Sequence, residues 1–489
     1  MLRQSVKLIA ILILLIVSLF SSLSNITTAQ VLTGRAQDTS ANNQNLEGIW
    51  QGAIEANAGI RLRLVLKISK SADGEFKGAL DSIDQSANNL PIDTINFKDA
   101  ALHFEMKMIS GIYDGKMSAD GTQIDGHWKQ GSADFPLLFR RTEKALTLVR
   151  PQEPKKPYPY DEREVSYENH QDKIKIAGTL TLPRVGSGPF PAALLITGSG
   201  PQDRDEALLG HKPFLVLADY LTRRGIAVLR VDDRGVGGTS RGGPNDTDEN
   251  YVEDALAGIE FLKQQKEINA KQIGLIGHSE GGIIAPMVAA RSADVAFVVL
   301  MAGPGVPGKK LLLMQSDLLL RAEMEKEVDS SVEATERMFK IALDEKDPTL
   351  ARKLMSAEQD RVITEQKKKV EQLQSLLQAQ TAMMLTPWFR YILNYDPRPT
   401  LMKVQVPVLA INGERDLQVP AKEDLAGIEE ALKAGGNKNF KTVVLPNLNH
   451  LFQTSETGAP SEYGDIEETI APIALQTIGD WIVAHTKKQ

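Results

Sequence analysis

The sequence predicts an α/β protein in which a mostly parallel sheet carries a helical lid insertion and follows a small all-β, barrel-like domain. Three observations predict it. Short alternating runs separated by turn signals fill residues 46–142, apolar runs alternate with amphipathic helical stretches from about residue 165, and charged, helix-favouring sequence interrupts that alternation at about 304–398. A chain of 489 residues is long enough to build two such domains.

The first 29 residues have the layout of a secretory signal peptide. "MLRQSVK" is a basic start, "LIAILILLIVSLF" an apolar run, and "SSLSNITTAQ" a polar tail with small residues, which predicts cleavage after Ala29. The apolar run is short for a bilayer span, so we expect a secreted or periplasmic protein with no stable membrane span after cleavage. An uncleaved N-terminal anchor is the alternative. Residues 30–44 are polar and without periodicity, which predicts a flexible leader.

Composition excludes several classes of function. The chain has no cysteine, which excludes disulfides, thiol nucleophiles and cysteine-ligated metals. A formal net charge of -7 without a basic stripe argues against nucleic acid as a partner. No H-E-x-x-H motif or His/Asp cluster is present, so we expect neither a metal nor another cofactor.

Residues 45–148 are predicted to form the all-β domain. "SADG" occurs twice between strand-like runs, which is typical of antiparallel hairpins. No polar cluster stands out, so a spacer or oligomerisation module is favoured over a ligand-binding barrel. Residues 149–164 contain four prolines and several charges, which predicts a stiff linker to the second domain.

The second domain, residues 165–489, contains the buried strands. The apolar runs that predict them are "AALLIT", "IAVLRVD", "QIGLIGH", "VAFVVLMAG", "VPVLAING" and "KTVVLPN". In sheets of this kind, ligands bind at the carboxyl ends of the strands. The chemistry is therefore expected in the loops that follow these runs, beneath a helical cap at about 304–398.

Ser279, in "IGLIGHSEGG", is the candidate nucleophile. It stands between a strand-like run and a helix-like one, and glycines at 277 and 281 allow a turn too tight for larger side chains. This turn exposes the serine hydroxyl at the top of the sheet. It also directs the backbone N–H of Glu280 and the helix N-terminus towards a developing oxyanion.

A serine nucleophile needs a base and a carboxylate that orients the base. His450 is the candidate base because it follows the strand "KTVVL". Asp416, in the loop after the preceding strand, is the candidate carboxylate, and Glu414 is the alternative. The other histidines are less suitable as the base. His103 and His127 lie in the β domain, His170 precedes the main sheet and His211 precedes the serine turn. His278 is directly beside the serine, and His485 is in the last helix.

The second domain resembles the α/β-hydrolase superfamily. From about residue 165 to 486 it is similar to secreted bacterial serine carboxylesterases, near the dienelactone-hydrolase and prolyl-oligopeptidase-like branches, at "LLITGSGPQDRDE", "GHSEGG", "PWFRYILNYDP" and "LNHLFQ". The resemblance implies an acyl-enzyme mechanism without a cofactor. Many members have His-Gly after the third strand, where this chain has Thr197 and Gly198, so the second oxyanion donor is expected at the Ser199 N–H, with Gly200 as the alternative.

Two charged segments are predicted to shape the site. "RVDDRGVGGTS" resembles a D-x-R-G-x-G segment common in the superfamily, and we interpret Asp232, Arg234 and Gly235 as loop architecture. Its glycines do not fit a dinucleotide-binding loop, and no phosphate-binding lysine follows. Arg204 and Asp205 are expected to form a charge pair that shapes the oxyanion loop.

Together these features predict a serine hydrolase that cleaves small-molecule carboxylic esters of short to medium acyl chain. A peptidase on the same scaffold is the nearest alternative, because the Glu280 carboxylate could hold a substrate amine. We expect no second acidic residue paired with Glu280, which argues against it. The last alternative is an inactive binding protein.

Overall fold

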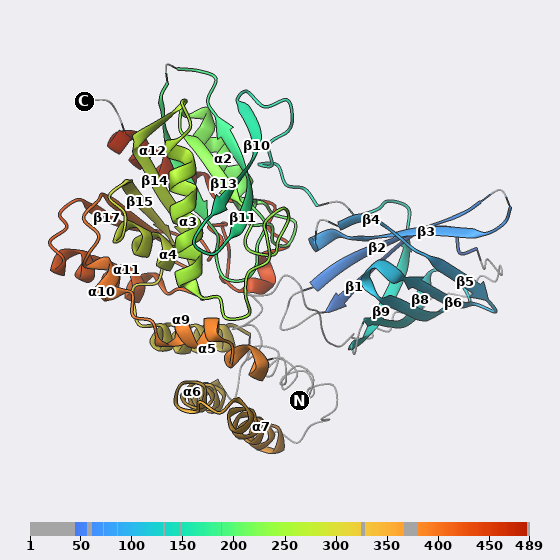
Figure 1. Cartoon of the computed structure of the whole chain (residues 1–489). Coiled ribbons are helices and arrows are strands. Elements are labelled where there is room, and N and C mark those ends of the chain that lie inside the picture. The colour runs from blue at the N-terminus through green and yellow to red at the C-terminus, as the bar shows by residue number, and fades with distance from the viewer. Residues whose placement is uncertain are drawn as a thin grey trace. The chain divides into compact units, whose positions relative to one another are not determined.

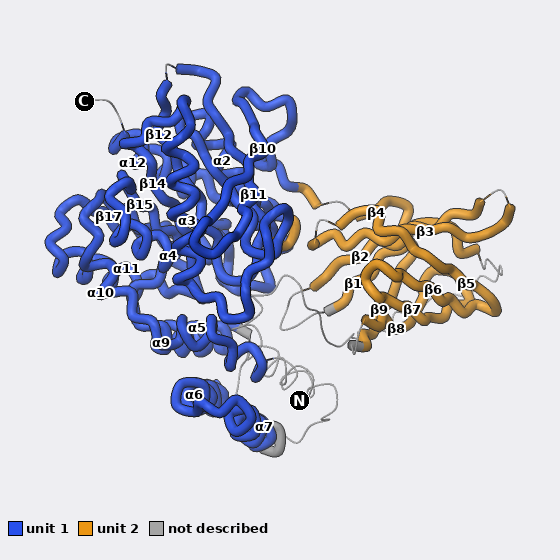
Figure 2. Tube along the Cα trace, in the orientation of Figure 1, with its two compact units in different colours: residues 1–21, 150–207, 211–489 blue, residues 22–149, 208–210 orange. Residues whose placement is uncertain are grey.

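The computed structural model describes residues 45–55, 61–71, 73–85, 87–130, 133–146, 148–186, 188–323, 328–365 and 380–486. These residues form two compact units (Figure 2). Of the described residues, the β unit contains those between 45 and 149 together with 208–210, and the α/β unit contains those of 150–207 and 211–486. The predicted signal peptide and leader lie outside the described residues.

The β unit is one antiparallel sheet of nine strands, in the order β4-β3-β2-β1-β9-β8-β7-β6-β5, which folds over on itself as a half-barrel (Figure 1). The strands are β1 (Gly48–Glu55), β2 (Arg61–Lys70), β3 (Phe76–Ser82), β4 (Ala87–Pro91), β5 (Thr94–Lys98), β6 (Ala101–Met106), β7 (Gly111–Met117), β8 (Gln123–Gln130) and β9 (Ala133–Thr142). Two short 3-10 turns, Ile83–Gln85 and Lys107–Ile109, interrupt it.

Alternation along these strands buries one face of the sheet. The core is aromatic, with Trp50, Phe104, Tyr113, Phe135 and Phe139 almost completely buried. Both predicted "SADG" hairpins are confirmed. β2 pairs with β3 and β7 with β8, and in the two turns the Gly74 N–H donates to Ser71 O and the Gly121 N–H to Ser118 O.

The α/β unit contains an eight-stranded sheet in the order β10-β11-β13-β12-β14-β15-β16-β17. The strands are β10 (Asp161–Asn169), β11 (Ile174–Leu182), β12 (Phe190–Ile196), β13 (Ala227–Val231), β14 (Ile268–His278), β15 (Val295–Met301), β16 (Val408–Gly413) and β17 (Phe440–Leu445). From β13 to β17 every neighbour is parallel, whereas β10 and β11 are antiparallel additions at one edge. The predicted mostly parallel sheet is thus confirmed.

Helices cover both faces of this sheet (Figure 1). One face packs against α3 (Asp248–Lys263), α4 (Gly281–Ala289) and α11 (Ala421–Ala434), and the other against α2 (Pro213–Arg223) and α12 (Pro472–Thr486). Burial on both sides explains the apolar run at residues 273–276 of β14 and along the whole of β15. A 3-10 turn, Pro460–Glu462, lies between β17 and α12.

The helical insertion lies between β15 and β16. The helices described in it are α5 (Gly308–Glu323), α6 (Val328–Asp344), α7 (Pro348–Glu365), α9 (Pro387–Asn394) and α10 (Arg398–Leu401). The core of the insertion includes Met338, Phe339, Met355, Met384 and Phe389. No helix in the described part of the chain combines the length and apolarity needed to cross a membrane.

The antiparallel edge of the sheet is the part of the fold that the sequence analysis does not anticipate. The last residues of the predicted linker, 161–164, are the beginning of β10. β10 has an exposed face, so its charged sequence "DEREVSYEN" lacks the apolar run by which the buried strands are recognised.

Candidate active site

Ser279 occupies a tight turn between a strand and a helix. β14 ends at His278, Glu280 caps α4, and α4 begins at Gly281. Ser279 has a φ of +52°, a left-handed conformation that non-glycine residues seldom adopt. A Cβ added at Gly277 would collide with the carbonyl of Gly281, and one added at Gly281 would collide with the carbonyl of Ile196 on β12. These close approaches explain why glycine is needed at both positions.

The structure brings Asp416 against His450. Both residues are buried and lie in loops after β16 and β17, and His450 Nδ1 lies 2.8 Å from Asp416 Oδ2. The other oxygen, Oδ1, accepts the backbone N–H groups of Gln418 at 2.8 Å and Val419 at 2.9 Å. These bonds fix the carboxylate, and through it the ring of His450.

Glu414, the alternative carboxylate, is exposed and accepts the backbone N–H of Asn447 at 3.0 Å. The remaining histidines have other partners. His103 bonds Asp114, His127 bonds Asp134, His170 lies near Glu168, His211 contacts Thr469, His278 contacts Glu206, and His485 bonds the Trp481 carbonyl. Among the described residues, no hydrogen-bond partner lies at His450 Nε2, which is where a base would receive the serine proton.

The loop after β12, residues 197–200, passes close to the nucleophile turn. A Cβ built on Gly198 would lie 3.3 Å from Ser279 Cβ. The Gly198 N–H already donates to Glu206 Oε1 at 2.8 Å. Within the described ranges, no acceptor is bonded to the backbone N–H of Ser199, Gly200 or Glu280, so these groups can donate to a ligand.

The predicted pair between Arg204 and Asp205 is wrong, because each side chain pairs with a different partner. Arg204 Nη2 lies 2.7 Å from Asp232 Oδ2, and its backbone N–H donates to Asp232 Oδ1 at 3.0 Å. Asp205 pairs with Arg230 of β13. Arg204 therefore ties the loop after β12 to the loop after β13, which is the shaping role expected of it but with another carboxylate.

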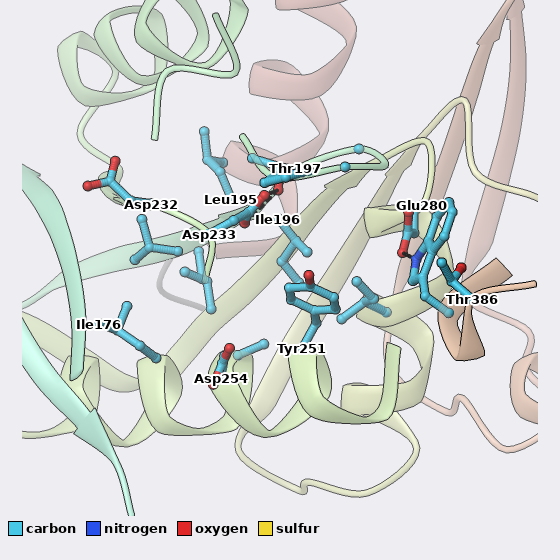
Figure 3. A pocket seen from close by; sticks show the side chains of 18 of the residues that line it. Ile176, Leu195, Ile196, Thr197, Asp232, Asp233, Tyr251, Asp254, Glu280 and Thr386 are labelled. Carbon is cyan, nitrogen blue, oxygen red and sulfur yellow. Dashed lines mark hydrogen bonds between the residues drawn. The ribbon is translucent and has the colours of Figure 1, made fainter. Parts of the chain in front are cut away.

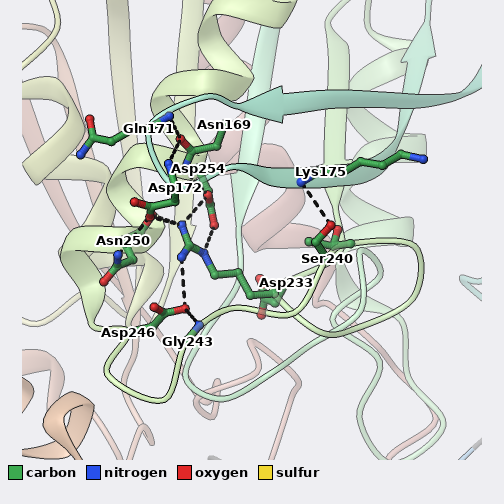
Figure 4. Close-up of polar contacts among 12 residues, drawn as sticks. Asn169, Gln171, Asp172, Lys175, Asp233, Ser240, Gly243, Asp246, Asn250 and Asp254 are labelled. Atoms are coloured by element: carbon green, nitrogen blue, oxygen red, sulfur yellow. Dashed lines mark hydrogen bonds and ion pairs between the residues drawn. The ribbon is translucent and has the colours of Figure 1, made fainter.

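Asp172, Asp246 and Asp254 converge on one guanidinium, that of Arg234, and so hold the loop after β13 in place (Figure 4). The guanidinium lies 2.6 Å from Asp172, 3.1 Å from Asp246 and 2.6 Å from Asp254, and the side chain is almost completely buried. Gly235, the next residue, has a φ of +81°. These contacts agree with the architectural role predicted for this segment.

A cavity of about 230 Å³ opens beside the nucleophile turn (Figure 3). Ile176 and Leu194 of the sheet and Ile284 of α4 give it apolar walls, and residues of α3 also line it. Glu280 and Asp233 face it, and Trp388 of the insertion borders it. Gly198 and Gly200 also line it, so the cavity reaches the potential donor groups of the loop after β12.

The Glu280 side chain has partners that the sequence does not indicate. Trp388 Nε1 donates to Glu280 Oε1 at 2.7 Å, and the Glu280 carboxyl interacts with that of Asp248, the first residue of α3. Both carboxyls are buried, and burial raises the pKa of both, that of Asp248 well above its usual range with a further contribution from Glu280. The expectation that no second acid pairs with Glu280 is therefore wrong.

Burial and the neighbouring acid disfavour ionisation of both carboxyls at once. The Trp388 N–H favours the ionised form of Glu280, whereas Glu280 raises the pKa of Asp248 further, so Glu280 is the carboxyl that ionises more readily. "DTDEN" at 246–250 indicates a helix start, but nothing in it indicates what Asp248 faces.

Comparisons with known proteins agree with this architecture. The family model described as serine aminopeptidase, S33, matches residues 212–456, half of the chain. Esterase EstD of Thermotoga maritima is 26% identical over 331 residues, which cover 67% of this chain and 68% of EstD.

Solved structures with similarity include an esterase of Pyrococcus furiosus and Est1E of Butyrivibrio proteoclasticus with ferulic acid bound. The first is 15% identical, covers 62% of this chain and 91% of its own, and has a TM-score of 0.40. The second is 16% identical, covers 66% of this chain and 100% of its own, and has a TM-score of 0.39. On the match to the family model over half of its length, the chain belongs to the α/β-hydrolase family described as serine aminopeptidase, S33.

Proposed function

We propose that this carboxylesterase-type hydrolase cleaves esters of short to medium acyl chain through a covalent acyl-enzyme. Ser279 is the nucleophile, His450 the base, and Asp416 the group that orients the base. The observation that carries the proposal is the buried 2.8 Å contact between His450 and Asp416, in loops at the same end of the sheet as the strained Ser279 turn.

The reaction begins when His450 Nε2 removes the hydroxyl proton of Ser279 as the serine oxygen attacks the ester carbonyl. Asp416 holds the Nδ1–H tautomer and stabilises the imidazolium that forms. The imidazolium then protonates the leaving alcohol as the tetrahedral intermediate collapses to the acyl-enzyme. Water, activated by His450, attacks the acyl group and releases the acid.

Backbone N–H groups of Glu280 and Ser199 stabilise the oxyanion in this proposal. The Glu280 N–H lies at the N-terminus of α4, where the helix dipole also favours negative charge. Because Gly198 already donates to Glu206, the second donor comes from further along its loop. Gly200, which lines the cavity with a φ of +87°, is the alternative to Ser199.

The cavity supports a small organic ester as substrate. Its walls are mainly apolar, and it ends beside the nucleophile turn, which suits an uncharged acyl chain. The relative EstD is named as an esterase, and the Est1E structure contains ferulic acid.

A matched pair of carboxylate variants tests the proposed roles. Asp416→Asn leaves the shape of the side chain but favours the wrong tautomer of His450, and we expect kcat on p-nitrophenyl butyrate to fall about 10²-fold to 10⁴-fold. Glu414→Gln removes a carboxylate two residues away and should leave kcat within about twofold. Equal effects of the two variants would contradict the assignment, as would wild-type turnover by Ser279→Ala.

A second candidate function is amide hydrolysis of substrates with a free α-amine. The observation that favours it is the acidic side chain of Glu280 at the cavity, with Asp248 beside it, because Glu280 accepts the Trp388 N–H and can ionise against a substrate amine. An aminoacyl p-nitroanilide and its N-acetylated counterpart form a matched pair of substrates. If only the free-amine amide is cleaved, and faster than a simple ester, the result favours a peptidase. If neither amide is cleaved, the result favours the esterase.

We also propose that residues 1–29 are a signal peptide and that the mature protein is secreted or periplasmic. The basic start and the apolar run support this assignment. N-terminal sequencing of protein exported by the native host should begin at Gln30. Recovery of an intact Met1 terminus in the membrane fraction would favour an uncleaved anchor.

A further inference from the structure

Glu206 and His278 connect the loops that surround the nucleophile. Glu206 Oε1 accepts the Gly198 N–H of the oxyanion loop at 2.8 Å and lies 2.9 Å from His278 Nδ1. On the other side of the ring, His278 Nε2 lies 3.0 Å from the backbone carbonyl oxygen of His450. His278 directly precedes Ser279, so this chain of contacts joins three loops of the proposed active site.

The partners of His278 determine its charge. A carboxylate oxygen and a backbone carbonyl oxygen are both acceptors, so each ring nitrogen needs a proton to make its bond. A neutral imidazole has one N–H and would leave the other nitrogen facing an acceptor across 3 Å of buried space. The contacts therefore fit an imidazolium beside the Glu206 carboxylate.

The electrostatics agree with this geometry. Burial by itself lowers the pKa of His278, but the carboxylate of Glu206 and the carbonyl of His450 outweigh it and raise the pKa above its ordinary value. Glu206 and His278 are only 4% and 5% exposed, which makes an unpaired charge on either one costly. The other ionisable groups that face His278 are His450, at a ring-centroid distance of 4.9 Å, and Asp416.

We propose that Glu206 and His278 are positioning residues, a buried carboxylate–imidazolium pair that holds the oxyanion loop and the His450 loop in register with Ser279. The inference rests on the proposed ester hydrolysis. Glu206 accepts the hydrogen bond of the Gly198 N–H. This bond orients the loop so that the next N–H groups, those of Ser199 and Gly200, point towards the substrate carbonyl. His278 fixes the backbone of His450, while Asp416 fixes its ring.

Glu206→Gln is the sharpest test because a single atom, Oε1, receives both bonds of Glu206. If the glutamine places its NH₂ group at this position, the hydrogen bonds that Oε1 accepts are lost. If it places its oxygen there, the bonds remain but the imidazolium loses its negative counter-charge. We expect kcat per titrated active site to fall about 10-fold to 100-fold with little change in KM. The fall of kcat at alkaline pH should also begin at lower pH, since the imidazolium releases its proton more easily.

Asp172→Asn is the matched control. Like Glu206→Gln, this substitution removes a carboxylate that pairs with a buried cation of the α/β unit. The cation here is Arg234, which still pairs with Asp246 and Asp254 after the change (Figure 4). It should leave kcat within about twofold and the pH profile unchanged. His278→Gln should reproduce the loss of Glu206→Gln, and the double variant should lose little more, because the two residues act as a pair.

The proposal is overturned if Glu206→Gln and His278→Gln retain kcat within about twofold and an unshifted pH profile. If neither variant folds, nitrogen NMR of histidine-labelled wild-type protein decides the question. At about pH 8 one slowly exchanging histidine should carry protons on both ring nitrogens, and its absence contradicts the proposal. This spectrum does not depend on turnover, so it separates failure of the inference from failure of the proposed function.

Discussion

At the scale of single residues, Glu280 and Asp248 act as one group. Burial raises the pKa of both carboxyls, and the Trp388 N–H favours ionisation of Glu280 over that of Asp248. Glu280→Gln removes only one of the two carboxyls, and the Asp248 carboxyl stays next to position 280. Selectivity against anionic substrates is therefore a property of the pair.

Substitution of both residues tests this account. Glu280→Gln with Asp248→Asn should raise the turnover of a hemisuccinate ester relative to a neutral butyrate ester by about 10-fold, whereas Glu280→Gln alone should change the ratio much less. The ratio of the two kcat/KM values is the measurement. A full effect from the single variant, or none from the double variant, would show that the pair does not set the charge at the cavity.

Asp424 gives the fold a pH dependence of its own. Its Oδ1 accepts the N–H groups of Gly305 at 2.7 Å and Val306 at 3.2 Å, at the beginning of the helical insertion, and it is completely buried. Burial raises the pKa of Asp424 to about 7. The folded protein therefore keeps this proton between about pH 4 and pH 7, where the unfolded chain has lost it.

The stability that this proton contributes is complete at low pH and is lost as the pH rises through that interval. At 1.36 kcal/mol per pKa unit the contribution is on the order of 4 kcal/mol. Asp424→Asn should flatten the dependence of the free energy of unfolding on pH between about 4 and 7, as measured by urea titration. An unchanged slope would mean that Asp424 ionises in the folded protein as it does in the unfolded chain.

At the scale of elements, the site depends on how closely β14, α4 and β12 approach. Gly281→Ala would force a methyl group onto the carbonyl of Ile196, so the strand, the turn or the helix has to move. We expect kcat to fall at least about 100-fold while the far-UV circular dichroism spectrum stays close to wild type. Wild-type turnover would show that the turn tolerates a wider geometry than its contacts indicate.

The sequence predicts these elements well where the local pattern and the tertiary role agree. Buried parallel strands are continuous apolar runs, and "GHSEGG" contains the glycines that its turn requires. The local pattern does not predict which side chains meet across the fold. Arg204 reaches Asp232 and not its neighbour Asp205, and Asp248 meets Glu280 from a helix 32 positions earlier in the numbering.

The edge strand β10 shows the same limit for secondary structure. Its polarity follows from having one exposed face, so it reads like a linker until its partner β11 is known. Glu206 and His278 were likewise unremarkable in the sequence, because their roles come from bonds to loops about 70 and 170 residues away.

At the scale of the whole molecule, the proposed reaction uses residues of the α/β unit alone. Ser279, Asp416, His450 and the cavity all lie within it, and the β unit has its own aromatic core. A chain that starts at Arg150 should therefore keep kcat on p-nitrophenyl butyrate within about threefold of the full protein. A folded fragment with much lower kcat would show that the β unit takes part in turnover.

Labelling with a fluorophosphonate tests the central claim most directly, because it reports which serine is activated as a nucleophile. We predict a single adduct, located by mass spectrometry on Ser279, that forms much more slowly in Asp416→Asn and does not form in Ser279→Ala. An adduct on another residue, or none on the folded wild-type protein, would contradict the account.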